Sequence, residues 1–233
     1  LMKYKLPGCE LAEIGGGIGQ FSYLVKQAGY IQTTFELSEA ICDWGRQNLN
    51  VVMHQGEISD INKEYEVIVS FDVLEHITEP KLFITQCLKH LKHSGVLCIQ
   101  TPCFSNQNVS DKSNRFRQLL IKDEHVFLYS RKSIQLLLEE AGLKYFQFEP
   151  AVFGDDYDMF LFASREPMIK NTDKEIDEYL NSIEPGRLLK SMMSLYHDVN
   201  EKEHVINELV RYKEYLEEER LMQRFTRKRK NKR

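Results

Sequence analysis

Glycine occupies four of the five positions from 15 to 19, between a short apolar segment and a segment with helical spacing. A glycine inside a regular element costs roughly 0.5–1 kcal/mol relative to alanine. Such a cluster therefore indicates a turn in which side chains must be absent. We expect a strand, a tight glycine turn and a helix at the start of the chain.

Apolar runs continue to alternate with helical patterns up to about residue 165. We expect strands at residues 9–14, 31–37, 50–54, 66–71, 96–101, 143–150 and 158–164. We expect helices at residues 20–29, 39–48, 79–95 and 130–142. This alternation predicts an α/β fold, a Rossmann-like and mostly parallel sheet of seven strands with helices on both faces.

The sequence changes character after residue 165, so we expect a domain at 1–165, a helical extension at 166–223 and a basic tail at 224–233. A polar helix at 171–186 precedes a heptad stripe whose members are Leu188, Met192, Leu195, Val199, Lys202, Ile206, Leu209, Lys213 and Leu216. This stripe predicts a coiled coil, with a second copy or a partner helix through residues 188–216. An amphipathic helix docked on its own domain is the alternative.

The charge of the chain is unevenly placed. The net charge is −4, but the last ten residues carry seven basic side chains and no acidic one, which leaves 24 basic against 35 acidic residues elsewhere. We therefore expect no nucleic-acid binding on the main domain. The tail either contacts RNA or anionic lipid or is simply solvated.

The apolar runs and the cysteines indicate in which cellular compartment the protein resides. No run approaches the ~20 apolar residues of a membrane-spanning helix. The five cysteines are odd in number and form no Cys-x-x-Cys pair, which argues against a disulfide framework or a cysteine zinc site. We expect a cytoplasmic protein, and because the sequence does not begin with Met, we expect it to be cut from a longer chain.

The spacing of the glycines distinguishes between cofactors. Gly15 and Gly17 fit the Gly-x-Gly-x-x-Gly fingerprint of dinucleotide folds, but its third position is Gln20. The spacing present is Glu13-x-Gly15-x-Gly17-x-Gly19. At a first strand–helix turn, this spacing resembles motif I of the class I S-adenosylmethionine-dependent methyltransferases.

Two further segments extend this resemblance over about residues 8–165. "FDVLEHI" at 71–77 is similar to the fourth-strand motif of the branch that contains ubiquinone-biosynthesis and many sugar O-methyltransferases. "HVFLYSRKSIQLLLEEAGL" at 125–143 is similar to the segment before that branch's last helix. The resemblance implies S-adenosyl-L-methionine as cofactor.

The resemblance also implies roles for the first two strand ends. Gly15, Gly17 and Gly19 would leave room for the methionine and ribose parts of the cofactor. Glu13 would lie near the cofactor's amino group. Glu36, 21 residues after Gly15, would accept hydrogen bonds from both ribose hydroxyls, as carboxylates do in dinucleotide sites.

The third and fourth strand ends supply the remaining cofactor residues. Glu57 stands where the family usually has Asp, which contacts the adenine amino group. Leu37 and Ile58 would sandwich the adenine ring. Phe71 and Asp72 would lie beside the sulfonium, unless they serve only in packing or helix capping.

A metal ion is the next question that the resemblance raises. Some ubiquinone-branch enzymes bind a divalent metal through Glu-x-x-Glu-His, and Asp72, Glu75 and His76 match this motif with one acid exchanged. Hard cations prefer carboxylate ligands. However, Glu-His is also frequent in branch members without a known metal, so we expect no metal site here.

Transfer of a methyl group to a hydroxyl requires a base within hydrogen-bond reach. His125 follows the long polar segment 103–124 and is our candidate for the catalytic base, beside Asp72, although it could instead support the loop. Asp155, Asp156 and Tyr157 could bind substrate hydroxyls, but a tight turn is the other interpretation of that stretch.

The sequence constrains the identity of the methyl acceptor least. "YDMFLFASREP" at 157–167, with the helices that follow it, resembles methyltransferases attached to bacterial polysaccharide systems. We therefore expect a hydroxyl of a saccharide or nucleotide-sugar. The alternatives are a small quinone-like or aromatic acceptor, and a non-catalytic scaffold that only binds the cofactor.

Overall fold

The computed structural model describes the backbone of residues 1–60, 62–105, 107, 109–110, 114–120, 124–150 and 157–230. It divides into two compact units, Leu1–Ile183 and Glu184–Arg233. The boundary lies later than the division at 165 expected from the sequence. Each unit is described here by itself.

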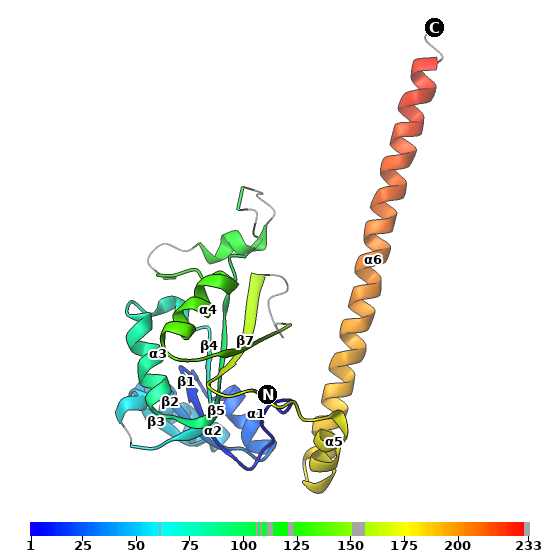
Figure 1. Ribbon diagram of the computed structural model, residues 1–233. Helices are drawn as coiled ribbons and strands as arrows, with labels where there is room; N and C mark the ends of the chain where they lie inside the picture. Colours follow the sequence, from blue (N-terminus) through cyan, green and yellow to red (C-terminus); the bar gives the residue numbers. More distant parts are fainter. Residues whose placement is uncertain are drawn as a thin grey trace. The chain divides into compact units, whose positions relative to one another are not determined.

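A seven-stranded sheet forms the centre of the first unit, in the order β3-β2-β1-β4-β5-β7-β6 (Figure 1). The strands are β1 (Glu10–Ile14), β2 (Ile31–Glu36), β3 (Met53–Gln55), β4 (Tyr65–Phe71), β5 (Leu91–Pro102), β6 (Tyr145–Glu149) and β7 (Asp158–Ser164). The first five pair in parallel, and β7 is antiparallel to both of its neighbours. The predicted Rossmann-like sheet is confirmed.

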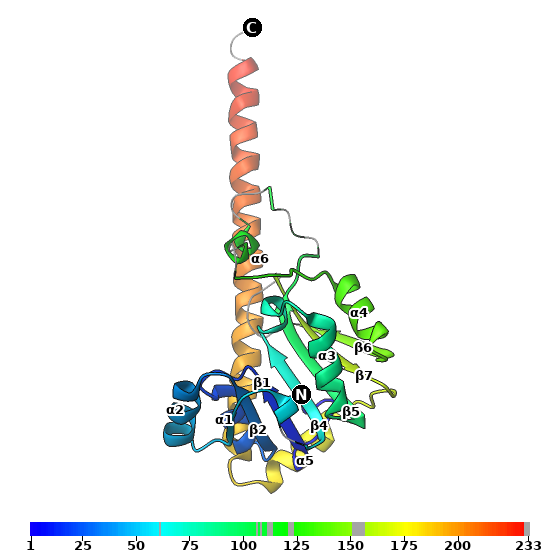
Figure 2. The same cartoon turned by 90° about the vertical axis from the view of Figure 1, so that its left-hand side faces the viewer.

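Helices cover both faces of this sheet (Figure 1, Figure 2). Right-handed crossovers place the β1–β2 and β4–β5 connections on opposite faces, because the two connections run in opposite directions along the sheet. Helices α1 (Gln20–Gln27) and α2 (Glu39–Leu49) contact each other. Helices α3 (Pro80–Lys89) and α4 (Arg131–Glu140) contribute Ile84, Cys87, Ile134 and Leu138 to one shared core cluster.

Helix α3 is shorter than the sequence pattern predicts. We expected it to continue to Gly95, but it ends at Lys89, and β5 begins at Leu91. The Arg165 guanidinium donates to the carbonyl oxygens of Leu88 and Leu91 at 2.5 and 2.9 Å. A cation at a helix C-terminus satisfies carbonyls that no helical N–H reaches, so the end of α3 is stabilised by a residue that directly follows β7.

Helix α5 (Asp173–Ser182) belongs to the first unit, although the sequence placed it in the extension. It begins with a capping box between Thr172 and Glu175. Its apolar face is buried through Ile176 and Leu180, which are 8% and 1% exposed. The Tyr179 hydroxyl donates to the Ala28 carbonyl at 3.2 Å, which ties α5 to the end of α1.

The second unit is dominated by one helix, α6 (Gly186–Lys230). The helix includes most of the predicted basic tail; residues 231–233 lie outside the described part. The described apolar side chains of its heptad stripe are at least half exposed: Leu188, Met192, Leu195, Val199, Ile206 and Leu209. Within the part of the chain that the structure describes, no helix is long and apolar enough to cross a bilayer.

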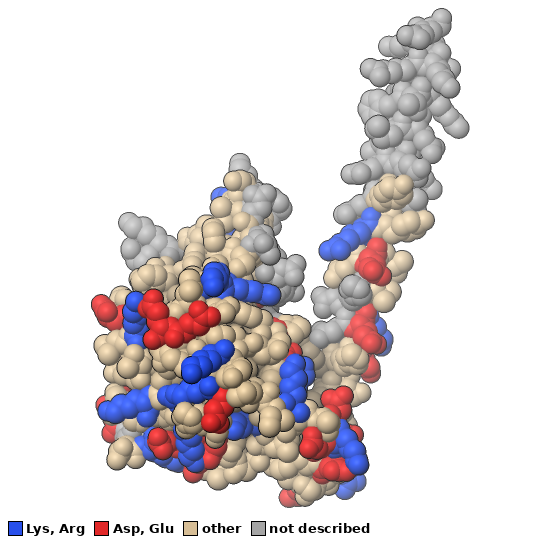
Figure 3. Space-filling model, viewed as in Figure 1, with Lys and Arg blue, Asp and Glu red and all other residues tan. Residues whose placement is uncertain are grey.

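Charged side chains of both signs are interspersed over the face of the first unit that Figure 3 presents. The carboxyl ends of the parallel strands meet at one edge of its sheet, where open α/β folds bind ligands. Three short 3₁₀ helices follow strands near this edge: η1 (Ile58–Asp60), η2 (Leu74–His76) and η3 (Arg115–Leu119). They bring residues distant in sequence to the same place.

Candidate active site at the carboxyl edge of the sheet

The glycine turn connects β1 to α1 with three residues in the left-handed region. Gly15, Gly17 and Gly19 have φ values of 70°, 51° and 83°. The Gly15 N–H donates to the Phe35 carbonyl at 2.8 Å, which fixes the turn against β2. A Cβ built at Gly17 would meet no heavy atom within 4 Å, so Gly17 faces open space in front of the helix.

Gly19 has a packing role within the protein. A Cβ there would lie 2.9 Å from Val51 Cγ2 and 3.2 Å from Met53 Sδ. Its missing side chain therefore lets α1 pack closely on the segment that enters β3. A cofactor contact by Gly19 remains a prediction.

Glu13 is buried beneath the glycine turn, with only 5% of its surface exposed. Its carboxylate accepts a hydrogen bond from the Ser22 hydroxyl, and a Cβ at Gly16 would lie 2.8 Å from it. Burial raises the pKa of Glu13 to about 7, against the hydrogen bonds from Ser22 and Thr34 that lower it. The carboxylate supports the turn from below, and its contact with a cofactor amino group stays a prediction.

Glu36 ends β2 and links it to two neighbouring segments. Its Oε2 accepts from the Gly17 N–H at 3.2 Å, and its Oε1 accepts from the Ser38 N–H at 3.0 Å. Both oxygens are therefore positioned, and a carboxylate has lone pairs for further donors. This arrangement agrees with the predicted role of Glu36 as an acceptor for ribose hydroxyls.

A cavity of about 400 Å³ opens beside the glycine turn. Five of the predicted cofactor residues line it: Gly15, Glu36, Leu37, Glu57 and Ile58. Leu37 is 70% exposed and Ile58 is 3% exposed. Of the two side chains expected to sandwich the adenine ring, Leu37 is therefore exposed to solvent and Ile58 is part of the core. Glu57 is exposed, and its N–H donates to Asp60 Oδ2 at 2.8 Å.

The opposite wall of this cavity was not predicted from the sequence. It consists of Val73, His76, Ile77, Thr78, Glu79, Leu82, Phe83 and Gln86. These residues come from the segment 73–79, which contains η2, and from α3; the fold brings both next to the glycine turn. The pattern at 79–95 predicted a helix here, although one that is too long, and nothing in it indicated which face lines a cavity.

Phe71 and Asp72 lie at the end of β4, outside the lining of that cavity. The Phe71 ring contacts Phe21 and Phe160, with centroids 4.9 and 5.6 Å away. Asp72 has a φ of 54°, a conformation that few non-glycine residues adopt and that is enriched at functional sites. Gln100 Nε2 donates to its carboxylate at 3.4 Å, and burial raises its pKa.

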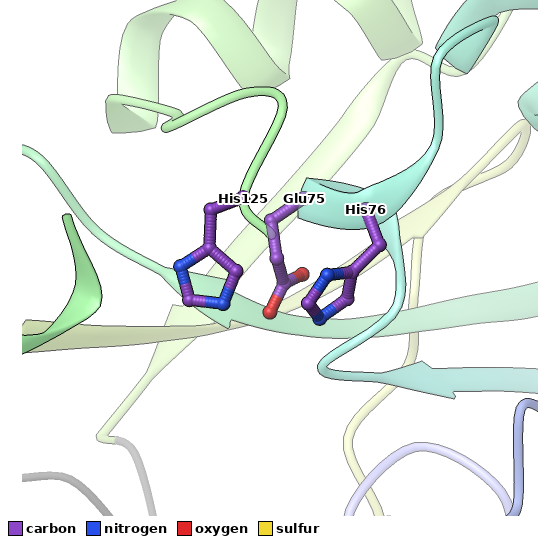
Figure 4. A group of neighbouring side chains, drawn as sticks. All are labelled: Glu75, His76 and His125. Carbon is purple, nitrogen blue, oxygen red and sulfur yellow. The ribbon is translucent and has the colours of Figure 1, made fainter. Parts of the chain in front are cut away.

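Glu75, His76 and His125 form a group in which one ligand atom from each lies within 4.8 Å of the others. Figure 4 shows the Glu75 carboxylate between the two imidazole rings. Glu75 is 1% exposed, and its Oε2 accepts from the Thr101 hydroxyl at 2.8 Å. All three residues are candidates by sequence, but nothing in the sequence predicts that they meet.

Backbone contacts hold this group together. The N–H groups of Val126 and Phe127 donate to the Glu75 carbonyl at 2.8 and 3.1 Å. The rings of His76 and His125 lie edge to face, with centroids 4.8 Å apart. The segment around His125 is thereby fixed against η2.

Asp158 is a further acidic residue that the sequence analysis missed. It begins β7 and pairs with Pro102 at the end of β5. Burial, together with the charges of Asp72 and Glu75, raises the pKa of Asp158 to about 7. Its position results from the antiparallel direction of β7, which brings the start of this strand to the carboxyl edge.

The polar segment 103–124 is only partly described. The Ser105 hydroxyl accepts from the Arg131 N–H at 3.0 Å, so it contributes to the start of α4. Asn106, Asn108, Asp155 and Asp156 lie outside the described residues, and their predicted contacts with an acceptor remain predictions. Tyr157 is half-buried, and its carbonyl accepts from the Cys103 N–H at 2.6 Å.

The fold and the glycine turn together define a nucleotide-cofactor-dependent enzyme of the α/β type. A family profile described as "Methyltransferase domain" matches residues 3–147. The chain belongs to this family and is a class I S-adenosylmethionine-dependent methyltransferase. S-Adenosylmethionine is its cofactor, as the sequence analysis predicted.

The individual curated relatives have low sequence identity to this chain. The ubiquinone biosynthesis O-methyltransferase of Coxiella burnetii (strain RSA 493 / Nine Mile phase I) is 27% identical over 104 residues, which are 41% of this chain and 44% of the relative. The chain thus spans less than half the length of the curated relative.

Two solved structures share the fold. Magnesium protoporphyrin IX methyltransferase from Synechocystis PCC 6803, with bound S-adenosylhomocysteine, is 17% identical with a TM-score of 0.53, over 70% of this chain and 76% of that one. Mitomycin 7-O-methyltransferase is 18% identical with a TM-score of 0.58, over 70% of this chain and 51% of that one. At these identities the likeness establishes the fold alone.

Proposed function

We propose that this protein transfers the methyl group of S-adenosylmethionine to a hydroxyl of a small, largely apolar acceptor, of aromatic or quinone-like character. One observation carries the choice of acceptor. Val126 and Phe127 directly follow His125 and are 47% and 40% exposed. Exposed apolar side chains beside a candidate catalytic group favour an apolar ligand.

Further aromatic side chains support this choice. Phe104, at the start of the segment after β5, is 43% exposed, and its ring contacts Phe116. Phe71 and Phe160 lie together at the ends of β4 and β7. A sugar site would instead need many convergent donors and acceptors, and Ser105 is already engaged with the start of α4.

The cofactor would lie along the cavity beside the glycine turn. Its adenine would fit between Leu37 and Ile58, and its ribose hydroxyls would donate to Glu36. The open space in front of Gly17 would take the methionine part. This arrangement leaves the sulfonium near the end of β4, so the methyl group would point toward Asp72 and His125.

The reaction is an in-line displacement. The acceptor oxygen forms a bond to the methyl carbon, the bond from that carbon to sulfur breaks, and S-adenosylhomocysteine leaves. The hydroxyl proton must pass to a base. A phenol ionises near pH 10, well below an alcohol, so an aromatic hydroxyl asks less of that base than a sugar hydroxyl does.

His125 is the residue that we place at the acceptor hydroxyl. Its Nδ1 lies 2.7 Å from the Leu119 carbonyl. Because a carbonyl can only accept, Nδ1 carries the proton and the neutral ring has its free lone pair on Nε2. That nitrogen is the one available to act on an acceptor.

Location and assembly complete the proposal. All five cysteines are free, which agrees with a reducing, cytoplasmic location. The heptad stripe of α6 has β-branched residues at Val199 and Ile206 and leucines at Leu195 and Leu209. β-Branched residues at a and leucine at d favour two-stranded parallel coiled coils, so we propose that α6 pairs with a second copy.

The direct test is methyl transfer from labelled S-adenosylmethionine. Purified full-length protein is incubated with a catechol or hydroquinone acceptor, with a nucleotide-sugar and without acceptor. We expect label only in the phenolic product. Turnover of the nucleotide-sugar but not of the phenols would contradict the proposed acceptor, and cofactor binding without turnover of any acceptor would favour the non-catalytic scaffold.

A further inference from the structure

We propose that Glu75, His76 and His125 bind a divalent metal ion of the first transition row. The ligand set would be two imidazoles and one carboxylate. From the sequence we expected no metal, because Glu-His is also frequent in branch members without a known metal, and His125 was not considered as a ligand. The fold instead brings His125 to the position where a third ligand is needed.

The two imidazoles are oriented as metal ligands usually are. His76 Nδ1 lies 2.8 Å from the Glu124 carbonyl, and His125 Nδ1 lies 2.7 Å from the Leu119 carbonyl. Each Nδ1 therefore donates a proton, which leaves the Nε2 lone pair free. Metal-binding histidines commonly donate their second nitrogen to a carbonyl in this way, because the contact fixes both tautomer and ring orientation.

The carboxylate is equally well fixed. The Thr101 hydroxyl donates to Glu75 Oε2 at 2.8 Å, and the Glu75 side chain is almost fully buried. Asp72 is less suited to be the third ligand, because it adopts a left-handed backbone conformation and accepts from Gln100. These contacts separate the ligand set of this chain from the acidic motif that it resembles.

The charges around the group favour a cation. Glu75 is buried and Asp158 is half-buried at the same edge. In the described portion of the chain, neither of them forms an ion pair with Lys or Arg. Carboxylates taken out of water without a positive partner are costly, and a divalent ion would compensate that charge.

The ligand types decide between metals. Mg²⁺ and Ca²⁺ prefer sites made of oxygen ligands, whereas imidazole suits zinc and its neighbours in the first row. A bound ion would supply Lewis-acid polarisation of an acceptor oxygen. His125 would then act as a metal ligand instead of the catalytic base. The metal proposal rests on the proposed function only in one respect, namely that the polarised oxygen belongs to the hydroxyl of the acceptor.

The experiment measures metal binding without turnover. Full-length protein is freed of metal with a chelator, and Zn²⁺ and Mg²⁺ are titrated separately by calorimetry; Co²⁺ is added to report imidazole ligation by its visible absorption. We expect one Zn²⁺ site of micromolar affinity or better, no Mg²⁺ binding at the same concentrations, and a Co²⁺ band. His76→Ala and His125→Ala should each weaken Zn²⁺ binding at least 10-fold.

The controls are matched by residue type. His93→Ala changes an exposed histidine on β5 and should leave Zn²⁺ affinity unchanged. Glu75→Gln keeps the size of the buried side chain and should also weaken binding, with circular dichroism to check its fold. Asp72→Asn should have little effect.

Three results would overturn the proposal. One is a loss of binding in Asp72→Asn that is absent in His125→Ala, because the acidic motif would then be the site. Another is an equal Zn²⁺ affinity in the His76→Ala, His125→Ala and His93→Ala variants. The third is the absence of Zn²⁺ binding. In each case methyl transfer by the wild-type protein remains a separate measurement, so the proposed function can stand when the metal proposal fails.

Discussion

The Glu36 carboxylate and the Gly17 backbone are joined by a hydrogen bond of 3.2 Å. The contact connects the end of β2 to a turn that begins 21 residues earlier in the chain. It holds the Glu36 carboxylate, our proposed acceptor for ribose hydroxyls, next to the open space in front of Gly17. Affinity for the cofactor should therefore depend on both residues.

Gly17→Val should abolish detectable binding of S-adenosylmethionine while the protein remains folded. Nothing lies within 4 Å of a Cβ at this position, so the new side chain would enter only the space that we assign to the cofactor. Calorimetry measures the affinity for S-adenosylmethionine. Thermal unfolding measures how much a valine at a positive φ destabilises the protein. Gly142→Val is the matched control, since Gly142 also has a positive φ and open space. Equal affinities in both variants would remove the cofactor assignment.

Glu36→Gln should weaken S-adenosylmethionine binding about 10- to 100-fold. Hydrogen bonds to a charged group contribute about 1.5–3 kcal/mol, and an amide offers a single acceptor oxygen. Glu39→Gln, an exposed change in the first turn of α2, serves as control for the loss of one negative charge. A Glu36→Gln affinity equal to that of the control would place the ribose elsewhere.

Glu13→Gln should change how stability depends on pH. The pKa of Glu13 is about 7 in the folded protein and about 4.5 in the unfolded chain. The folded state therefore holds this proton more tightly than the unfolded chain does. The contribution of Glu13 to the free energy of unfolding is greatest below pH 4.5 and falls as the pH rises to 7. Above pH 7 the buried charge costs on the order of 3 kcal/mol.

The neutral amide of Glu13→Gln lacks this titration. Denaturant unfolding of the cofactor-free protein at pH 5 and pH 8 should give a free-energy difference between variant and wild type that favours the variant more at pH 8. Because other groups titrate in both proteins, only this difference is informative. A difference that is independent of pH would mean that Glu13 is ionised in the folded state.

His125→Ala should lower turnover about 10²–10⁴-fold, with cofactor affinity nearly unchanged. The side chain acts on the acceptor in either role, as base or as metal ligand, and it does not line the cofactor cavity. Single-turnover rates with saturating cofactor provide the measurement, and His93→Ala provides the control. Near-normal turnover of the true acceptor by the His125 variant would exclude it from the chemistry.

Leu195→Glu combined with Leu209→Glu should convert a dimer into a monomer. Both side chains are exposed in the isolated chain and lie in the heptad seam of α6. A charge buried in that seam would oppose pairing. Analytical ultracentrifugation compares this variant with Ser194→Glu, which adds a charge outside the seam. A wild-type monomer at high micromolar concentration would contradict the coiled coil.

Local sequence patterns determined most of the elements of this protein. β-Branched and apolar runs predicted the strands, and the glycine cluster predicted the turn, because both depend on neighbours in the chain. The cofactor was implied by the resemblance of the glycine motif to a known family. The end of α3 was predicted wrongly. Its limit depends on Arg165, a residue 76 positions beyond Lys89, and no local pattern contains that contact.

Only the tertiary structure decided which chemical groups meet. His76 and His125 are 49 positions apart, and Asp158 reaches the same edge because β7 runs against its neighbours. Their grouping depends on crossover connections and on backbone contacts between η2 and the segment after η3. The sequence by itself identified residues that can perform acid–base or ligand chemistry. Distances between them follow from the packing of the whole sheet, because long-range contacts place strand ends that are remote along the chain.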